Sequence, residues 1–571
     1  MQVYEKLINA FLLHGGSVLG AVFRNDWLKK AQHSRNGSEK ILLRRLRRNA
    51  DTEYGKRYGF SSVTSVASYQ DQVPLSTYDD YEPYISETIK TGRQKLIVHD
   101  KISFFATTSG TVGFTKLIPH IAVSYFPYFK WLCITSNDIV KAMKKRHVPS
   151  FNARGILLTE IFQDEIPDRY KDGPIAHDIS LGGVSSFAVG GIRLFLPLVT
   201  QMPGITINNP EVKDLTYIKA RYALQDPDLT YFCGVFSSVL YDFVNYLTDN
   251  RELLIRDIEL GRIDPSVQIS DNVRARLEKK LKPDPIRAAE LRAIFETESD
   301  TPLINRLWKN MSYVFSIGSG DFEPFTKKLK ALCCDDVSFG YVLYSASEAF
   351  MGCAMNMDEP YYLLVNDDAF FEFLPVDEPC DRPLRMHELK EGKLYEVILT
   401  NISGFYRYQI KDVIRVVRFE GESPYVQFAY RANRIGNLNG THITGEHFDA
   451  VVRKLEEVTG KNLIEYSAYV NFETEKPRIE LFAESEDHFT PEEQQQLSVI
   501  AEEAFQEYIT DYALVRKHNT AAMAQVYLLK PGTYAEYRRQ RVAEGASLNQ
   551  LKTPRVLTTE KQYNYFKNSI L

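Results

Sequence analysis

This sequence lacks the features that mark several specialised classes of protein. Its 571 residues include six cysteines, and no two of them have the CxxC spacing of a zinc or redox site. No apolar run approaches the roughly 20 residues that span a bilayer. The first residues, MQVYEKLINAFLLHGG, contain Glu5 and Lys6 and lack the three regions of a secretory signal, so they read as an amphipathic helix. These absences predict a cytoplasmic protein with reduced, buried cysteines.

A large excess of charge of one sign is also missing. The net charge is −5, which gives no global attraction to nucleic acid or to an anionic membrane. The basic run 44–48 has apolar leucines at helical spacing, so a solvated helix face is the better interpretation. We therefore expect no nucleic-acid partner and no membrane partner, and either a monomer or a weak homo-oligomer.

The length and the patterning indicate two domains. A chain of 571 residues exceeds what one hydrophobic core usually supports. Helical patterns dominate the first hundred residues and return from about 216 to 300, whereas strand patterns fill about 340 to 430. After 431 the sequence alternates between strand patterns, such as IEYSAYVNF and RIELFAE, and helical patterns, such as residues 491–508. We predict a mixed α/β and α+β fold, with a large domain over 1–430 and a small α+β domain over 431–571.

The first segment with chemical character follows the strand-like run 102–106. It reads TTSGTVGFTK, from 107 to 116. Glycines let the backbone bring its N–H groups close to an anion, and hydroxyls and a lysine add donors and positive charge. This pattern favours a phosphate-binding loop, although the Walker A spacing is absent and many such clusters are plain surface loops. The candidate phosphate contacts are Thr108, Ser109, Gly110, Thr111 and Lys116.

Two further segments end or precede predicted strands. In YSASE, the Tyr344 ring can stack on a base, the Ser347 hydroxyl can bind phosphate, and the Glu348 carboxylate can hold Mg²⁺, which prefers oxygen ligands. In GFYRYQIKD, Asp412 can accept two hydrogen bonds from a ribose diol. Taken singly, Glu348 is better explained as a solvated residue at a strand end, and Asp412 as a turn residue that precedes Val413.

Two late segments complete the pattern. RANRIGNLNG begins at Arg431, a candidate nucleotide contact, and GASLNQLKTPR contains Lys552. A lysine in a loop near a C-terminus is normally just solvated. The order and approximate spacing of all these segments give them more weight than each has alone.

In that order, the segments resemble the motifs of the adenylate-forming superfamily, which includes acyl-CoA synthetases and luciferases. Within it, the chain resembles the auxin-responsive Gretchen Hagen three family of acyl-acid amido synthetases. The specific matches are TSGTVGFTKLIP, YSASEAFMG, FFEFLPV, GFYRYQIKD and GASLNQLKTPR. The resemblance covers almost the whole chain.

The resemblance implies ATP and Mg²⁺ as cofactors, a carboxylic acid as substrate and an amine, such as an amino acid, as acceptor. It makes Lys552 and Glu348 the catalytic residues, Glu348 being also the metal ligand. Nucleotide contacts would come from the phosphate loop, Tyr344, Ser347, Asp412 and Arg431. The small domain would be mobile and would carry Lys552 toward and away from the reacting groups.

The sequence departs from the family pattern at a few positions. Thr108 stands where serine is usual, which keeps the hydroxyl. Gln409 and Lys411 replace the arginine and glycine of the plant-like pattern YRYRLGD, which bears on the local turn. Asn433 stands at the hinge position, where aspartate or lysine is usual.

Two alternative functions stay open, and so does the role of one aromatic segment. The chain could be an acyl-CoA ligase, with the same adenylation and a thiol acceptor, or a nucleotide-binding regulatory protein that has lost catalysis. The second is disfavoured because Glu348, Asp412 and Lys552 are all present. The aromatic segment from Leu229 to Leu247 could line the acyl pocket or form a core helix, because pockets and cores share composition.

Overall fold

The computed structural model describes most of the chain, namely residues 3–108, 116–149, 153–158, 173, 180–182, 203–206, 209, 211–318, 323–341, 343–376, 380–431, 434–438, 441–543, 556–557 and 559–571. It separates into two compact units, of which the larger holds Met1–Thr108 and Leu117–Ala429 and the smaller holds Ser109–Lys116 and Tyr430–Leu571. Each unit mixes helices with sheets, which confirms the predicted fold class. Among the described residues, no helix is long and apolar enough to cross a membrane.

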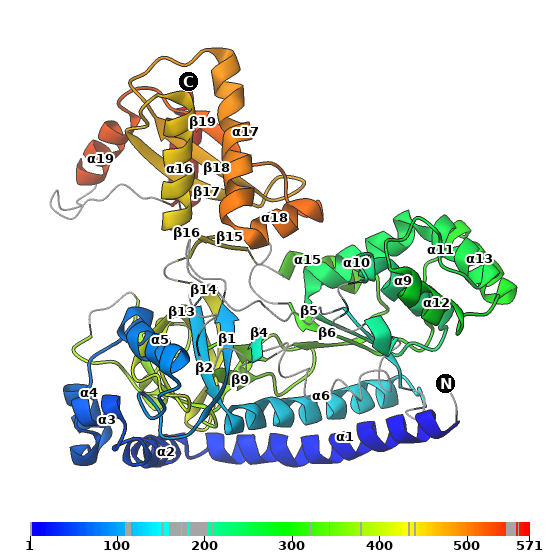
Figure 1. Ribbon diagram of the computed structural model, residues 1–571, viewed down its shortest axis with the longest axis horizontal. Coiled ribbons are helices and arrows are strands. Elements are labelled where there is room, and N and C mark those ends of the chain that lie inside the picture. The colour runs from blue at the N-terminus through cyan, green and yellow to red at the C-terminus, as the bar shows by residue number, and fades with distance from the viewer. Residues whose placement is uncertain are drawn as a thin grey trace. The chain divides into compact units, whose positions relative to one another are not determined.

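Helices open the larger unit. They are α1 (Val3–Ala31), α2 (Ser34–Arg48), α3 (Glu53–Arg57), α4 (Val66–Gln72) and α5 (Glu82–Thr91). The long helix α1 lies beside α6 (Phe126–Lys145), as Figure 1 shows. Their backbones approach closely at Gly20, where an added Cβ would overlap the carbonyl oxygen of Cys133. Glycine is therefore required at this crossing.

A parallel sheet with helices forms the second part of this unit. Its order is β3 (Gly155–Leu157), β5 (Tyr231–Phe236), β6 (Tyr313–Ile317) and β7 (Ser338–Tyr341), and each neighbouring pair is parallel. The helices are α9 (Leu215–Gln225), α10 (Ser237–Asp249), α11 (Arg251–Leu260), α12 (Asp271–Glu278), α13 (Pro285–Glu296), α14 (Leu303–Leu307) and α15 (Glu323–Ala331). Their apolar side chains share one core with Phe232 and Val314 of the sheet. In such sheets ligands bind beyond the carboxyl ends of the strands.

A seven-stranded sheet follows, from the region where the sequence predicts strands. Its order is β11 (Ala369–Pro375), β12 (Leu394–Asn401), β13 (Tyr408–Glu420), β14 (Ser423–Arg431), β10 (Tyr362–Leu364), β9 (Phe350–Cys353) and β8 (Tyr344–Ser345). A separate small sheet joins β2 (Lys116–Ile121), β1 (Ile102–Thr108) and β4 (Ser180–Gly182). Side chains from both sheets and from the N-terminal helices form one core cluster.

The smaller unit has a three-stranded sheet with helices on both faces. The sheet order is β17 (Glu465–Asn471), β18 (Arg478–Glu484) and β19 (Gln525–Leu528). One core cluster joins it to α16 (Gly445–Thr459), α17 (Pro491–Tyr508) and α18 (Thr510–Lys517). A second cluster joins it to α19 (Thr533–Ala543) and α20 (Glu560–Lys567). A hairpin of β15 (Arg434–Leu438) and β16 (Thr441–Thr444) precedes α16.

Candidate functional site

Two of the predicted nucleotide contacts touch each other. The Tyr344 hydroxyl donates a hydrogen bond to Asp412 Oδ2 at 3.2 Å, and both side chains are buried. Three strands separate β8, which carries Tyr344, from β13, which carries Asp412. In a flat sheet, four spacings of about 4.8 Å would put these strands about 19 Å apart. The sheet therefore curls, and its curl brings together residues 68 positions apart in the sequence.

A bulge in β13 redirects the chain next to Asp412. Glu396 and Ile398 of β12 are two positions apart, whereas their partners Val413 and Gln409 are four positions apart. The extra residues of β13 have no partners of their own in this ladder. Such bulges bend a strand and re-aim its side chains, often beside active sites. Asp412 lies on this bulge, which accounts for its side chain reaching Tyr344.

Lys411 adopts a left-handed backbone, with φ of 65°, inside the same bulge. Glycine reaches this conformation without steric cost, and other residues do so with strain. The chain thus keeps a glycine-like turn even though lysine replaces the glycine of the family pattern. The Lys411 ammonium pairs with Glu396 at 3.1 Å, and the Gln409 amide donates to the same carboxylate. Both side chains that differ from the family pattern, Gln409 and Lys411, therefore point to Glu396 of the neighbouring strand.

Ser347 and Glu348 form the corner of a tight turn between β8 and β9. The turn is closed by Ala346 and Ala349, which exchange backbone hydrogen bonds of 3.0 and 3.3 Å. Its corner carbonyls are held from outside the hairpin: His120 Nε2 lies 2.8 Å from the Ser347 oxygen, and Asn401 Nδ2 donates to the Glu348 oxygen at 2.7 Å. The backbone at Glu348 is thus held by side chains from two strands of different sheets, β2 and β12.

The Glu348 carboxylate suits a cation carried by a ligand. The residue is 6% exposed, and no donor of the described residues makes a hydrogen bond to its carboxylate. A carboxylate in a largely buried residue is stabilised when a positive charge approaches it. In the described part of the chain no three His, Cys, Asp or Glu side chains cluster as a metal cage. Mg²⁺ held by one carboxylate and by substrate phosphates fits such a site.

Burial controls the protonation of groups near this turn. It raises the pKa of Asp368 to about 7, although the Phe350 N–H donates to that carboxylate at 2.7 Å. Burial also raises the pKa of Tyr128 far above its usual range, with a smaller contribution from the charges of Asp368 and Glu348. In such surroundings the few remaining charges act strongly on a ligand.

Several predicted site residues lie wholly or partly outside the described residues. Lys116 opens β2, and Thr108 closes β1, with a side chain that is not described. Arg431 ends β14, and its side chain is likewise not described. The residues that fall entirely outside are Ser109, Gly110, Thr111, Asn433 and Lys552.

The aromatic segment from Leu229 to Leu247 consists of a strand and a helix, β5 and α10. Its side chains Leu240, Phe243, Val244 and Leu247 are all buried in the core of the parallel-sheet region. These residues are core, as the second interpretation of the segment predicted. The strand was not expected there.

Sequence reasoning missed three polar residues that hold this region together. His120 and Asn401 fix the Glu348 turn, as described above. Arg407 lies within the GFYRYQIKD motif, and its guanidinium pairs with the buried Glu372 at 3.1 Å and donates to the carbonyls of Gln70 and Val73. A signal existed for His120 and Asn401: a polar side chain in an otherwise apolar strand is buried with a partner.

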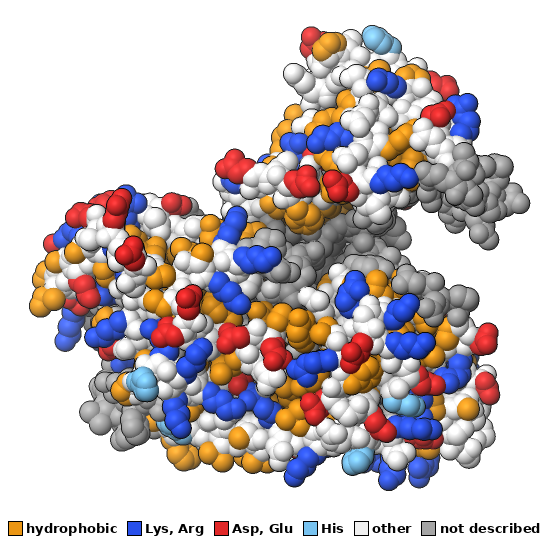
Figure 2. All heavy atoms as spheres, turned by 180° about the vertical axis from the view of Figure 1, so that it is seen from behind, with side chains coloured by type: hydrophobic (Ala, Val, Ile, Leu, Met, Phe, Trp, Pro, Cys, Tyr) orange, Lys and Arg blue, Asp and Glu red, His pale blue; other side chains and the backbone are white. Residues whose placement is uncertain are grey.

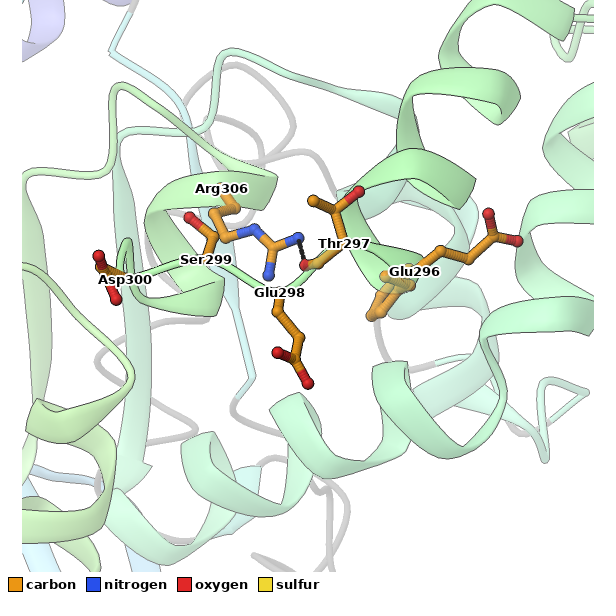
Figure 3. Close-up of a pocket in the computed structure, with 7 residues that line it drawn as sticks. Glu296, Thr297, Glu298, Ser299, Asp300 and Arg306 are labelled. Atoms are coloured by element: carbon orange, nitrogen blue, oxygen red, sulfur yellow. Dashed lines mark hydrogen bonds between the residues drawn. The ribbon is translucent and has the colours of Figure 1, made fainter.

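A surface hollow of about 690 Å³ lies elsewhere, between α13 and α14. Figure 3 shows Arg306 turned toward the Thr297 carbonyl, which accepts a hydrogen bond from its guanidinium at 2.5 Å. Arg306 thus caps the end of α13, where a cation stabilises the exposed carbonyls. The hollow contains none of the predicted site residues.

Comparison with protein families finds three successive matches along the chain. The GH3 family N-terminal domain matches residues 25–337, the central domain matches 362–431, and the C-terminal domain matches 446–561. The first of these alone covers more than half of the chain.

Individual relatives are distant in sequence but similar in extent. Jasmonoyl-L-amino acid synthetase JAR4 of Nicotiana attenuata is 24% identical over 538 residues, covering 90% of each chain. The probable indole-3-acetic acid-amido synthetase GH3.1 of Arabidopsis thaliana is 24% identical, covering 90% of this chain and 88% of its own. The structure of AtGH3.15 acyl acid amido synthetase in complex with 2,4-DB aligns with a TM-score of 0.62, at 20% identity over 96% of each chain.

Proposed function

This chain belongs to the GH3 family, and from that premise we propose that it is an ATP-dependent ligase that converts a carboxylic acid to an acyl-adenylate and then transfers the acyl group to an amine. The observation that carries the proposal is the hydrogen bond between the Tyr344 hydroxyl and Asp412. Tyr344 belongs to the β8–β9 hairpin, and Glu348 lies in the turn of the same hairpin. Residues from separate motifs converge there, as a nucleotide site requires.

The chemistry explains why a nucleotide is needed. A carboxylate acylates poorly, because oxide would have to leave. Attack of its oxygen on the α-phosphorus of ATP forms a mixed anhydride and releases pyrophosphate, and AMP is then a good leaving group. Negative charge gathers at the phosphates in the first step, so preorganised donors and cations aimed at them lower the barrier.

The nucleotide would be held by residues from several elements. Tyr344 would stack on adenine. Asp412, which contacts the Tyr344 hydroxyl, would accept hydrogen bonds from the ribose hydroxyls. The phosphates meet Thr108 to Thr111, with Lys116, Ser347 and Arg431 as further nucleotide contacts. Mg²⁺ at Glu348 would offset phosphate charge, a role that a carboxylate ligand fits.

The small domain, residues 431–571, would supply Lys552 to the first step. The separate compactness of Tyr430–Leu571 and the family match over 446–561 support a division of the chain near residue 430. We propose that Lys552 bridges the incoming carboxylate and the α-phosphate and that rotation of the small domain then removes it, so that the acceptor can enter.

An amine is the proposed acceptor, in particular an amino acid. The names of the relatives support this choice, since they are synthetases of jasmonoyl-amino acids and of indole-3-acetic acid amides. The rival is an acyl-CoA ligase, which would share the adenylation and differ only in its thiol acceptor. A catalytically inactive nucleotide-binding protein is disfavoured by the presence of Glu348, Asp412 and Lys552.

We also propose that the protein works in the cytoplasm, as a monomer or a weak homo-oligomer. All six cysteines lie in the described part of the chain and are free thiols there. Free thiols suit a reducing compartment. Basic and acidic side chains are interspersed over the face shown in Figure 2, so no field of one sign favours a nucleic acid there.

The experiment that tests the proposal is a screen for pyrophosphate release from Mg·ATP. The acid panel contains jasmonate, indole-3-acetate and simple aliphatic and aromatic acids. Acids that release pyrophosphate are then incubated with a mixture of amino acids or with coenzyme A, side by side. Amide formation supports the proposal, thioester formation supports the rival, and release of ADP in place of AMP contradicts both.

A further inference from the structure

His120 makes a hydrogen bond that the nucleotide chemistry alone does not explain. Its Nε2 lies 2.8 Å from the carbonyl oxygen of Ser347, and the residue is 2% exposed. His120 belongs to β2, the strand that follows the predicted phosphate loop in the sequence. Ser347 belongs to the turn that carries Glu348. One buried contact therefore links the strand after the loop to the turn with the proposed metal ligand.

The direction of this bond is determined by its partners. A carbonyl oxygen can only accept, so Nε2 must carry the proton. Burial lowers the pKa of His120 to about 4, which leaves the ring neutral near pH 7, with its proton on Nε2. The ring stacks on Phe104 at 4.6 Å, and Phe104 stacks on Tyr125 at 5.4 Å. The imidazole is thus held in one orientation.

Asn401 holds the next carbonyl of the turn in the same way. Its Nδ2 donates to the Glu348 oxygen at 2.7 Å. Its Oδ1 accepts from the backbone N–H groups of Ser403 and Phe405 at 3.0 and 2.9 Å, so the amide cannot be reversed without losing these bonds. Both corner carbonyls of the turn are therefore fixed by side chains that cannot reorient.

We propose that His120 is a positioning residue, which sets the location of the Glu348 carboxylate relative to β2 and thereby the place where a metal ion can bind. This inference rests on the proposed function. Groups that orient a metal ligand typically change metal affinity or activity by about 10- to 100-fold when they are removed. His120 touches neither substrate nor metal in this account, and its effect passes through the turn.

The test compares two replacements of His120 in the full-length protein. His120→Phe keeps a stacked ring and removes the donor, whereas His120→Gln keeps a donor near the position of Nε2. The readout is Mn²⁺ affinity in the presence of a non-hydrolysable ATP analogue, followed by the paramagnetic resonance of free Mn²⁺. We expect His120→Phe to weaken Mn²⁺ binding at least about tenfold and His120→Gln to stay within about threefold of the wild type.

Ser124→Ala is the matched control. It removes another buried hydrogen bond nearby, between the hydroxyls of Ser124 and Ser403 at 3.1 Å, without touching the Glu348 turn. This variant is expected to lose thermal stability and to bind Mn²⁺ as the wild type does. If His120→Phe does not fold, His120→Met removes the donor with a more adaptable side chain and carries the same expectation.

The outcomes separate this inference from the proposed function. A folded donor-less variant that binds Mn²⁺ with wild-type affinity, while the wild type releases pyrophosphate, overturns the positioning role alone. A wild-type protein that neither binds Mn²⁺ with the analogue nor releases pyrophosphate with any acid overturns both. Equal weakening in Ser124→Ala shows a general loss of stability and also overturns the inference.

Discussion

Lys411 occupies a backbone conformation that its side chain disfavours. With φ of 65° inside the β13 bulge, it should be more strained than glycine at the same place. At ordinary strand positions glycine is less favourable than alanine by about 0.5–1 kcal/mol. We predict the reverse here: Lys411→Gly should be more stable than Lys411→Ala by about 1 kcal/mol. Urea unfolding of both variants measures the difference.

Both Lys411 variants lose the pair with Glu396, so that loss cancels from the comparison. Arg415, exposed in the same strand and without a left-handed backbone, is the control position, where alanine should be the more stable replacement. Alanine being the better residue at both positions would show that the bulge does not impose this conformation.

Asp412 should contribute to ATP binding through its charge. A hydrogen bond to a charged group contributes about 1.5–3 kcal/mol, and 1.4 kcal/mol corresponds to a tenfold change in affinity. We predict that Asp412→Ala weakens binding of a Mg·ATP analogue about 10- to 100-fold in calorimetric titration. Gln409→Ala, which alters the same bulge but removes a side chain that points to Glu396, should leave the affinity unchanged. A folded Asp412→Ala protein with wild-type affinity would remove Asp412 from the ribose site.

At this scale the sequence predicted residue types better than contacts. The aromatic, hydroxyl and acidic residues of YSASE and GFYRYQIKD were selected by order and spacing. The contact between Tyr344 and Asp412 could not be derived, because it depends on the curl of a sheet and on a bulge of two extra residues in one strand. His120 and Asn401 were missed because a single polar residue in an apolar strand has many possible partners.

Among the elements, the packing of α1 on α6 depends on one small residue. An added Cβ on Gly20 would overlap the backbone of α6, whereas one on Gly15 would meet nothing within 4 Å. We predict opposite effects of the same substitution on one helix. Gly20→Ala should destabilise the protein by about 1–3 kcal/mol, because it forces the helices apart. Gly15→Ala should stabilise it by up to about 1 kcal/mol, because alanine is the better helix former.

Thermal unfolding of the two glycine variants tests this pairing of helices. Similar melting temperatures for both would mean that α1 and α6 do not cross as closely as the structure has them. Retained secondary structure in circular dichroism is the check that Gly20→Ala reports packing and not a loss of helix.

Elements with clear periodicity were predicted within one or two residues. The helix expected over 491–508 is α17, and the strands expected from the runs IEYSAYVNF and RIELFAE are β17 and β18. The strand β5 was missed because a short apolar run such as YFCGVF fits a strand or a buried helix equally. The length of the run and its flanking residues usually decide between a strand and a helix. Here α10 begins directly after β5, so the sequence shows no boundary between them.

At the scale of the whole molecule, the two compact units have separate proposed tasks. The larger would seat ATP, and the smaller would lend Lys552 to adenylation only. We predict that Lys552→Ala lowers acid-dependent pyrophosphate exchange at least about 100-fold, the loss typical when a transition-state charge partner is removed. Aminolysis of a synthetic acyl-adenylate should fall less than about threefold, since an interaction absent from that transition state does not affect its rate.

Lys530→Ala is the control for this prediction, because Lys530 is an exposed residue of the same unit. It should change neither half-reaction. Equal loss of both half-reactions in Lys552→Ala would indicate a role other than the one proposed, and loss of neither would place Lys552 outside the active site.

The order of the domains could be predicted from the sequence, whereas the strand order within each sheet could not. Length, the change of texture near 430 and the ordered motifs were enough to expect a large and a small domain. Strand order is set by contacts between distant segments, such as β14 with β10, which no local pattern in the chain encodes.

The most direct measurement of the central claim follows an oxygen atom. An acid that passes the screen is labelled with ¹⁸O in its carboxylate and incubated with the protein, Mg·ATP and an amine acceptor. If the acyl-adenylate forms and an amine then displaces AMP, one ¹⁸O atom per turnover appears in the phosphate of AMP, and the amide keeps the other. The appearance of ¹⁸O in inorganic phosphate, together with ADP, would show activation through an acyl phosphate and contradict the account.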